Sequence, residues 1–81
     1  MGATYYQIEE RFSRLFGIIA NISPHSQINI RDLAKEFGVS ERTIKRDLLI
    51  LQQAKLGIYF EGRFIRITRI GYKKIRSWLI S

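Results

Sequence analysis

The chain has 81 residues, of which 14 are lysine or arginine and seven are aspartate or glutamate, so its formal net charge is +7. This length suffices for one core only, so we expect residues 1–81 to form a single domain. Cysteine is absent, which excludes disulfides and thiolate metal sites. No apolar run approaches the roughly 18 residues of a membrane span, and the N-terminus lacks the pattern of a signal peptide. We therefore expect a cytoplasmic, nucleoid-associated location and no membrane partner.

The positive charge is concentrated in the second half of the chain. Residues 1–41 contain four basic and five acidic side chains, whereas residues 42–81 contain ten basic and two acidic ones. A basic field confined to one region favours a polyanion as partner, and a merely soluble basic protein would not require this segregation.

The residues that support catalysis are too few and too scattered to form a site. One histidine, seven dispersed carboxylates and no glycine-rich phosphate loop leave no pattern for a catalytic, cofactor-binding or metal-binding site. We therefore expect a protein that is not an enzyme and needs no cofactor.

The first element predicted along the chain is an amphipathic helix. Thr4-Tyr5-Tyr6-Gln7 has the form of a capping box, which opens a helix. Pro24 favours an end to this helix near Asn21. The apolar residues after the cap recur at helical spacing and predict the buried face: Ile8, Phe12, Leu15, Phe16 and Ile19. Next, the alternation of residues 28–30 predicts a three-residue strand.

Residues 31–54 predict two short helices joined by a tight turn. Gly38 can adopt a positive φ at no steric cost. Ser40 can cap the second helix by accepting a hydrogen bond from the backbone N–H near Thr43. The second helix, residues 41–54, has a buried stripe and an outward face. The stripe is Ile44, Leu48 and Leu51, whereas Arg42, Arg46, Leu49, Ile50 and Gln53 lie on the far side, with Thr43 and Lys45 on its flanks.

Two features of the second helix depart from a simple basic helix. Leu49 and Ile50 form an apolar pair on the outward side, and we expect them to pack within the chain, with contact to another subunit as the alternative. Asp47 should pair with a cation inside the chain, because phosphates would repel a carboxylate.

The segment after residue 57 predicts a hairpin and a last helix. Residues 58–68 read as two strands around Glu61-Gly62, and Thr68 can cap a helix at residues 69–80. In that helix Tyr72, Ile75 and Leu79 align, with Trp78 beside them. A hairpin directly after a helix-turn-helix is a wing. The expected fold class is therefore α+β, a winged helix-turn-helix of order α-β-α-α-β-β-α.

The sequence LAKEFGVSERTIKRDL at residues 33–48 resembles the helix-turn-helix of DeoR-type winged-helix transcriptional regulators. The resemblance implies that the DNA-facing residues are Ser40, Arg42, Thr43, Lys45 and Arg46. One position departs from the family pattern, because the glycine that usually closes the helix is replaced by Lys55, and a glycine follows only at Gly57.

The leading hypothesis is sequence-specific binding of double-stranded DNA in transcriptional regulation, with the helix at residues 41–54 in the major groove. Arg42 or Arg46 could read guanine, and the residues that could neutralise phosphates are Arg42, Lys45, Arg46, Arg63 and Arg66. We expect a homodimer formed through the first helix, the last helix or both. Two alternatives remain open at this point: a winged helix that binds a partner protein, and the DNA-binding module of a replication or plasmid-maintenance protein.

Overall fold

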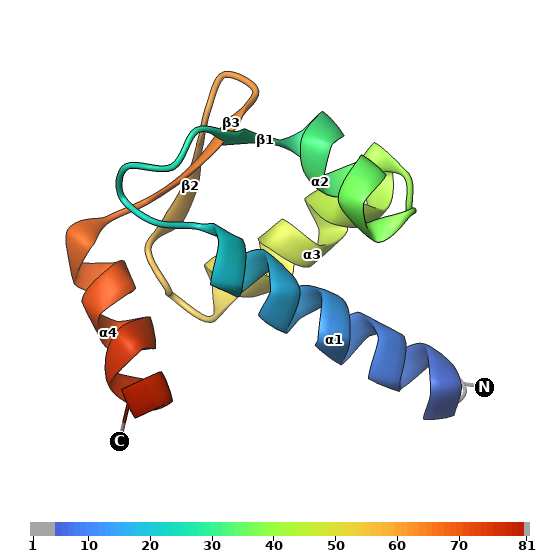
Figure 1. Ribbon diagram of the computed structural model, residues 1–81, viewed down its shortest axis with the longest axis horizontal. Helices are drawn as coiled ribbons and strands as arrows, with labels where there is room; N and C mark the ends of the chain where they lie inside the picture. The colour runs from blue at the N-terminus through green and yellow to red at the C-terminus, as the bar shows by residue number, and fades with distance from the viewer. Residues whose placement is uncertain (1–4, 81) are drawn as a thin grey trace.

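The computed structural model describes residues 5–80, with side chains described for residues 9–78. The elements follow the predicted order (Figure 1) and are α1 (Tyr5–Asn21), β1 (Ile28–Asn29), α2 (Ile30–Phe37), α3 (Glu41–Gln53), β2 (Ile58–Glu61), β3 (Phe64–Ile67) and α4 (Arg69–Ile80). These four helices and one small sheet confirm the α+β winged helix-turn-helix. The predicted capping box at Thr4 lies outside the described residues.

The sheet has three antiparallel strands in the order β1-β3-β2. Ile58 pairs with Ile67 in the hairpin, and Ile28 pairs with Ile65 on the other side of β3. Successive residues of a strand point to opposite faces, and accordingly Ile65 and Ile67 are buried while Phe64 is exposed. The wing, which we define as residues 58–67, therefore attaches to the body through one face.

The strand before the helix-turn-helix is one residue shorter than predicted. Ile30 was expected to end the strand but begins α2 and is buried. The cause is Asn29, whose side chain accepts a hydrogen bond from the backbone N–H of Asp32 at 2.8 Å and so caps α2 one residue earlier.

The core lies where α1, α2, α3 and the inner face of the sheet meet. Its largest fully buried apolar side chains come from four different elements and are Ile18, Leu33, Ile44, Leu48 and Ile65. The predicted stripe of the second helix is thus confirmed, since Leu51 is buried as well.

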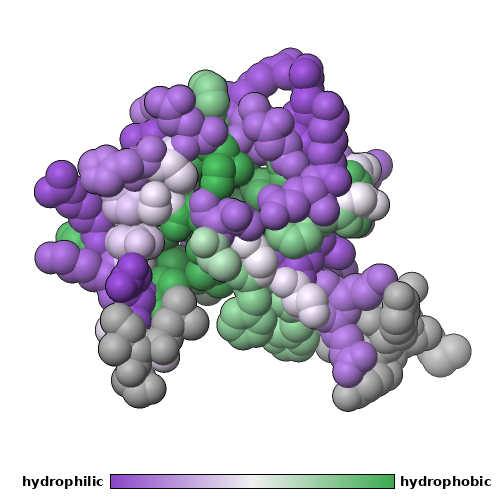
Figure 2. Space-filling model, in the orientation of Figure 1, coloured by the Kyte–Doolittle hydropathy of each residue, from purple (hydrophilic) through white to green (hydrophobic). Residues whose placement is uncertain are grey.

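The buried face predicted for the first helix is wrong in part. Phe12 and Phe16 are 58% and 64% exposed, whereas Ile18 and Ile22, which the predicted stripe did not include, are buried. Leu15 and Ile19 lie between these two faces and pack against the core. Figure 2 shows hydrophobic residues along the lower side of α1, between the ends of α1 and α4. The side chain of Ile8 lies outside the described residues.

The last helix begins as predicted and contacts the body near its start. The hydroxyl of Thr68 accepts a hydrogen bond from the backbone N–H of Gly71 at 3.0 Å. Ile75 is buried and Tyr72 packs against the core. The side chain of Leu79, which was expected to extend this row, lies outside the described residues.

Candidate nucleic-acid interface

The turn between α2 and α3 has the geometry that its residues predict. Gly38 adopts a left-handed conformation with φ 65° and ψ 34°, and the backbone N–H of Val39 donates to the carbonyl of Ala34 at 3.0 Å. The hydroxyl of Ser40 then accepts from the backbone N–H of Thr43 at 3.1 Å and lies 3.1 Å from the hydroxyl of Thr43. This cap satisfies an otherwise unpaired N–H and fixes where α3 begins.

One face of α3 is held by the core and the opposite face is free for a ligand. Ile44 and Leu48 are completely buried, while Arg42, Lys45 and Arg46 are exposed. Residues at i, i+3, i+4 and i+7 share a face of a helix. The exposed face of α3 therefore includes Arg42, Lys45, Arg46, Leu49, Ile50 and Gln53, with Thr43 half-buried at its edge.

A buried carboxylate joins α3 to α1. Asp47 is 1% exposed, and both of its oxygens accept hydrogen bonds from the guanidinium of Arg14, with 3.2 Å between Nη2 and Oδ1. The intramolecular pair expected for Asp47 is thus confirmed. The hydrogen bond to Asp47 is the main reason that the pKa of Arg14 lies above its ordinary value.

The two arginines predicted to contact DNA from the wing occupy different environments. Arg63 follows Gly62 in the hairpin turn and is exposed. Arg66 is half-buried, and its guanidinium donates to the carbonyls of Ser26 at 3.1 Å and Pro24 at 3.3 Å. The structure therefore leaves Arg63 exposed in the wing turn but attaches Arg66 to the connector that precedes β1.

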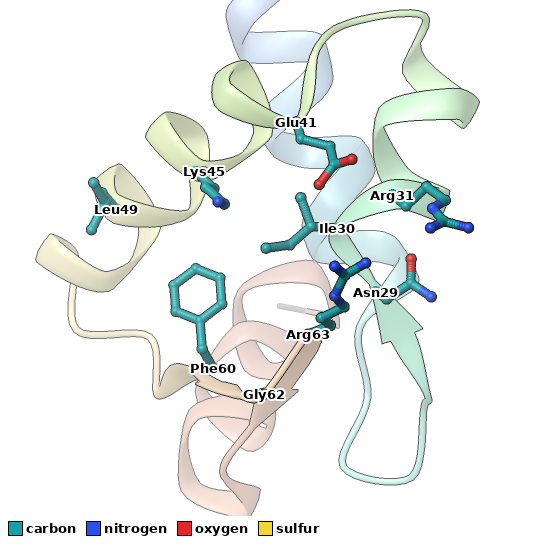
Figure 3. A pocket seen from close by; sticks show the side chains of 9 residues that line it. All are labelled: Asn29, Ile30, Arg31, Glu41, Lys45, Leu49, Phe60, Gly62 and Arg63. Carbon is teal, nitrogen blue, oxygen red and sulfur yellow. The ribbon is translucent and has the colours of Figure 1, made fainter.

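A groove of about 590 Å³ lies between α3, the start of α2 and the wing (Figure 3). The Phe60 ring extends from the wing toward α3, where Lys45 and Leu49 lie, and Arg63 and Arg31 lie on the other side. The residues that line the groove are Asn29, Ile30, Arg31, Glu41, Lys45, Leu49, Phe60, Gly62 and Arg63. Three cations from three elements thus face one groove, together with the single carboxylate of Glu41.

Sequence reasoning did not identify Arg31 as a site residue. Its position in the first turn of α2 was the available signal, since that turn follows the short strand that pairs with the wing. The backbone N–H of Ile30 donates to the carbonyl of Arg63 at 3.4 Å, which holds the start of α2 beside the wing turn.

The expectation that Leu49 and Ile50 pack within the chain is wrong. Leu49 is 53% exposed and Ile50 is 37% exposed. The wing is attached to the body through Ile58, Ile65 and Ile67, which belong to the buried core. It therefore does not cover Leu49, and an open groove remains between the wing and α3.

Within residues 9–78 no group of three or more histidine, aspartate or glutamate side chains is placed to hold a metal ion. None of the helices in residues 5–80 combines the length and the apolar content that a membrane span needs.

Comparison with known proteins gives one family. A family model described as an HTH domain matches residues 14–73, which include the turn, α3, the wing and the start of α4. No curated protein and no solved structure matches the chain significantly.

Proposed function

We propose that this chain, which belongs to the helix-turn-helix (HTH) domain family, binds double-stranded DNA sequence-specifically and regulates transcription. In this proposal α3 lies in the major groove and the wing contacts the adjacent backbone or minor groove. We place the protein in the cytoplasm, on the nucleoid, among regulators of the DeoR type.

The observation that carries the proposal is the division of α3 into two faces. Ile44 and Leu48 fix the helix from behind, and Asp47 anchors it to α1. The exposed side then presents three cations within two turns. The major groove of B-DNA is about 12 Å wide and admits one α-helix. A rigid cationic helix that projects from a folded body matches this groove in both shape and charge.

Within the proposed interface the cations have different roles. Arg42 and Arg46 can each donate two parallel hydrogen bonds to guanine O6 and N7, a contact that discriminates between bases by about 1–3 kcal/mol. Lys45 and Arg63 neutralise phosphates, which adds affinity without sequence preference. Ser40 and Thr43 place the start of α3 against the DNA. We assign Arg66 a structural role, because its guanidinium already donates to two backbone carbonyls.

The salt dependence of duplex binding tests this proposal. Neutralising about four phosphates should weaken binding several hundredfold between about 50 and 300 mM salt. The double variant R42A/R46A should lose most of the binding to a random duplex. The control K73A/K74A removes the same charge from exposed positions on α4 and should retain it. Absence of duplex binding at both salt concentrations would refute the proposal and favour the protein-interaction alternative.

Selection of bound sequences from a random duplex pool tests the sequence specificity. Arg46→Ala should abolish the preference among sequences, whereas Arg63→Ala should weaken binding to all sequences similarly. If Arg46→Ala kept the preference intact, the proposed placement of α3 would be wrong. The same selection gives the spacing of half-sites, which is about 34 Å for one turn of DNA.

We propose that the protein acts as a homodimer formed through α1. Phe12 and Phe16 are one turn apart on the solvent-facing side of this helix, and two exposed phenylalanines at this spacing form an apolar stripe. Since Arg14 on the same helix is paired with Asp47 of α3, a dimer formed at α1 would also set the relative placement of the two recognition helices.

A further inference from the structure

The exposed face of α3 contains two large apolar side chains beside its cations, Leu49 and Ile50, and of these Leu49 lines the groove. Leu49 follows Lys45 by four residues and Arg46 by three, so it lies in the same row as these two cations. It is 53% exposed, even though α3 is a well-anchored helix whose other side is fully buried. The centre of the proposed recognition surface is thus apolar.

The surroundings of Leu49 restrict what can contact it. The groove beside it is lined by Arg31, Lys45 and Arg63 against one carboxylate, that of Glu41. An apolar protein surface placed here would take three cations out of water without partners for them, which is unfavourable. A polyanion with an apolar group between its charges fits both features.

Duplex DNA carries such a group on its bases. In the major groove the edges of the bases present hydrogen-bond donors and acceptors, and thymine alone adds a methyl group, at C5. We propose that Leu49 reads a thymine by contact with this C5 methyl, and that the Phe60 ring shields the contact from water on the wing side (Figure 3). This inference rests on the proposed DNA-binding function and adds a specificity-determining residue to it.

The proposal predicts a small loss of DNA affinity when the methyl group of one particular thymine is removed. Transfer of one methyl group from water to an apolar contact is worth roughly a fourfold change in affinity. Replacing the thymine by deoxyuridine removes this methyl and leaves every hydrogen-bonding group of the base in place. The ratio of the affinities for the thymine and deoxyuridine duplexes therefore measures the methyl contact alone, because the phosphate contacts are the same in both.

The test uses the full chain and the duplex obtained by selection. Each thymine in a half-site is replaced in turn by deoxyuridine, and dissociation constants are measured by fluorescence anisotropy at one salt concentration. For the wild type, one position should lose about fourfold. For Leu49→Ala, the thymine and deoxyuridine duplexes should bind equally at that position. Ile50→Ala is the matched control, because Ile50 is the adjacent exposed apolar residue and does not line the groove; it should keep the wild-type ratio.

Several outcomes would overturn the inference. A wild-type ratio of one at every thymine, a selected site with no preferred thymine, or persistence of the ratio in Leu49→Ala would each do so. If Leu49→Ala weakened both duplexes equally and the wild-type ratio were one, Leu49 would contact deoxyribose instead. In all these cases the protein still binds DNA, whereas failure of the wild type to bind any duplex would refute the proposed function as well.

Discussion

Arg14 of α1 and Asp47 of α3, 33 positions apart in the sequence, form a two-point ion pair at the back of the recognition helix. A carboxylate this deeply buried requires a partner, since an unpaired charge in the protein interior is strongly unfavourable. The pair joins the side chains of two helices that are distant in the sequence. It therefore fixes the position of α1 relative to α3 as well as contributing to stability.

Removal of one partner should cost more than removal of both. Arg14→Ala leaves Asp47 buried without a cation and should lower the free energy of unfolding by about 3 kcal/mol or more. The double variant R14M/D47L replaces the pair by apolar side chains and should lose less. Urea denaturation followed by circular dichroism measures both, and equal losses would contradict a buried charge as the cause.

The raised pKa of Arg14 sets the pH range of this contribution. A cation whose pKa is higher in the folded state contributes fully below its unfolded value and loses that contribution only as the pH rises through the folded value. An arginine side chain is already protonated across the pH range in which proteins are usually studied, and a further rise in its pKa keeps it so. The contribution of this guanidinium should therefore not change by its own titration between about pH 5 and pH 9.

Arg63 and Arg66 are three residues apart on the wing, but their replacement by alanine should affect different properties. Arg66→Ala should lower stability, and Arg63→Ala should lower DNA affinity. Arg66→Ala removes two hydrogen bonds from a charged donor to backbone carbonyls and should lower the free energy of unfolding by about 1–2 kcal/mol. It should change the dissociation constant for DNA by less than about twofold, because this guanidinium is outside the proposed interface. Arg63→Ala should weaken DNA binding while leaving stability within about 0.5 kcal/mol. A larger loss of DNA binding in Arg66→Ala than in Arg63→Ala would reverse our assignment.

Lys55 adopts the conformation that glycine usually provides at this position. It has a φ of 57° directly after the C-cap of α3 and is exposed. A non-glycine residue in the left-handed region is strained by roughly 1–2 kcal/mol. Lys55→Gly should therefore raise the free energy of unfolding, by about 0.5–1 kcal/mol after the added flexibility of glycine in the unfolded chain is counted.

The matched control for this substitution is Lys73→Gly. Lys73 is also exposed but lies inside α4, where glycine should lower the free energy of unfolding by about 1 kcal/mol. Thermal or urea denaturation shows whether each variant raises or lowers the free energy of unfolding. A destabilised Lys55→Gly variant would show that the lysine side chain makes a contribution that its backbone conformation does not reveal.

The helix-turn-helix could be predicted from the sequence because its determinants are local. Gly38, Ser40 and the spacing of Ile44 and Leu48 act within a few residues of one another, and the structure has each in its expected role. The wing and the pairing of Asp47 within the chain followed from pattern and charge in the same way.

The remaining features depend on packing between distant elements. The apolar residues of α1 cover more than one side of that helix, and spacing alone could not decide that Ile18 would be buried and Phe12 exposed. The ion pair between Arg14 of α1 and the buried Asp47 of α3 determines which side of α1 faces the core. Likewise, Arg31 reaches the groove only because β1 pairs with the wing, a relationship that the sequence around Arg31 does not encode.

The dimer proposed through α1 should depend on Phe16. Phe16→Glu places a charge in the exposed apolar stripe and should convert the dimer to a monomer in sedimentation velocity, without unfolding, since the side chain is 64% exposed. Ile70→Glu is the control, because Ile70 is 82% exposed on α4 and has the same change in charge. Dissociation by Ile70→Glu and not by Phe16→Glu would move the dimer interface from α1 to α4.

At Gly71, α4 lies in close contact with the backbone of residues 56 and 57. A Cβ built at this residue would lie 2.0 Å from the carbonyl oxygen of Leu56 and 3.0 Å from the Cα of Gly57. Both neighbours are backbone atoms, so no side-chain rotation can relieve the overlap. Leu56 is itself buried, and the segment cannot move away without disturbing the core.

Gly71→Ala should therefore displace α4, although alanine is a better helix former than glycine by about 1 kcal/mol. We expect a net loss of about 1–3 kcal/mol in the free energy of unfolding, the range typical of overpacked sites, because the displacement also withdraws Ile75 from the core. Ser77→Ala, at an exposed position of the same helix, should stay within about 0.5 kcal/mol of the wild type. Since no described side chain of α4 lines the groove, the folded fraction of Gly71→Ala should keep the DNA affinity of the wild type. A variant as stable as the wild type would mean that α4 is not held against Leu56 in solution.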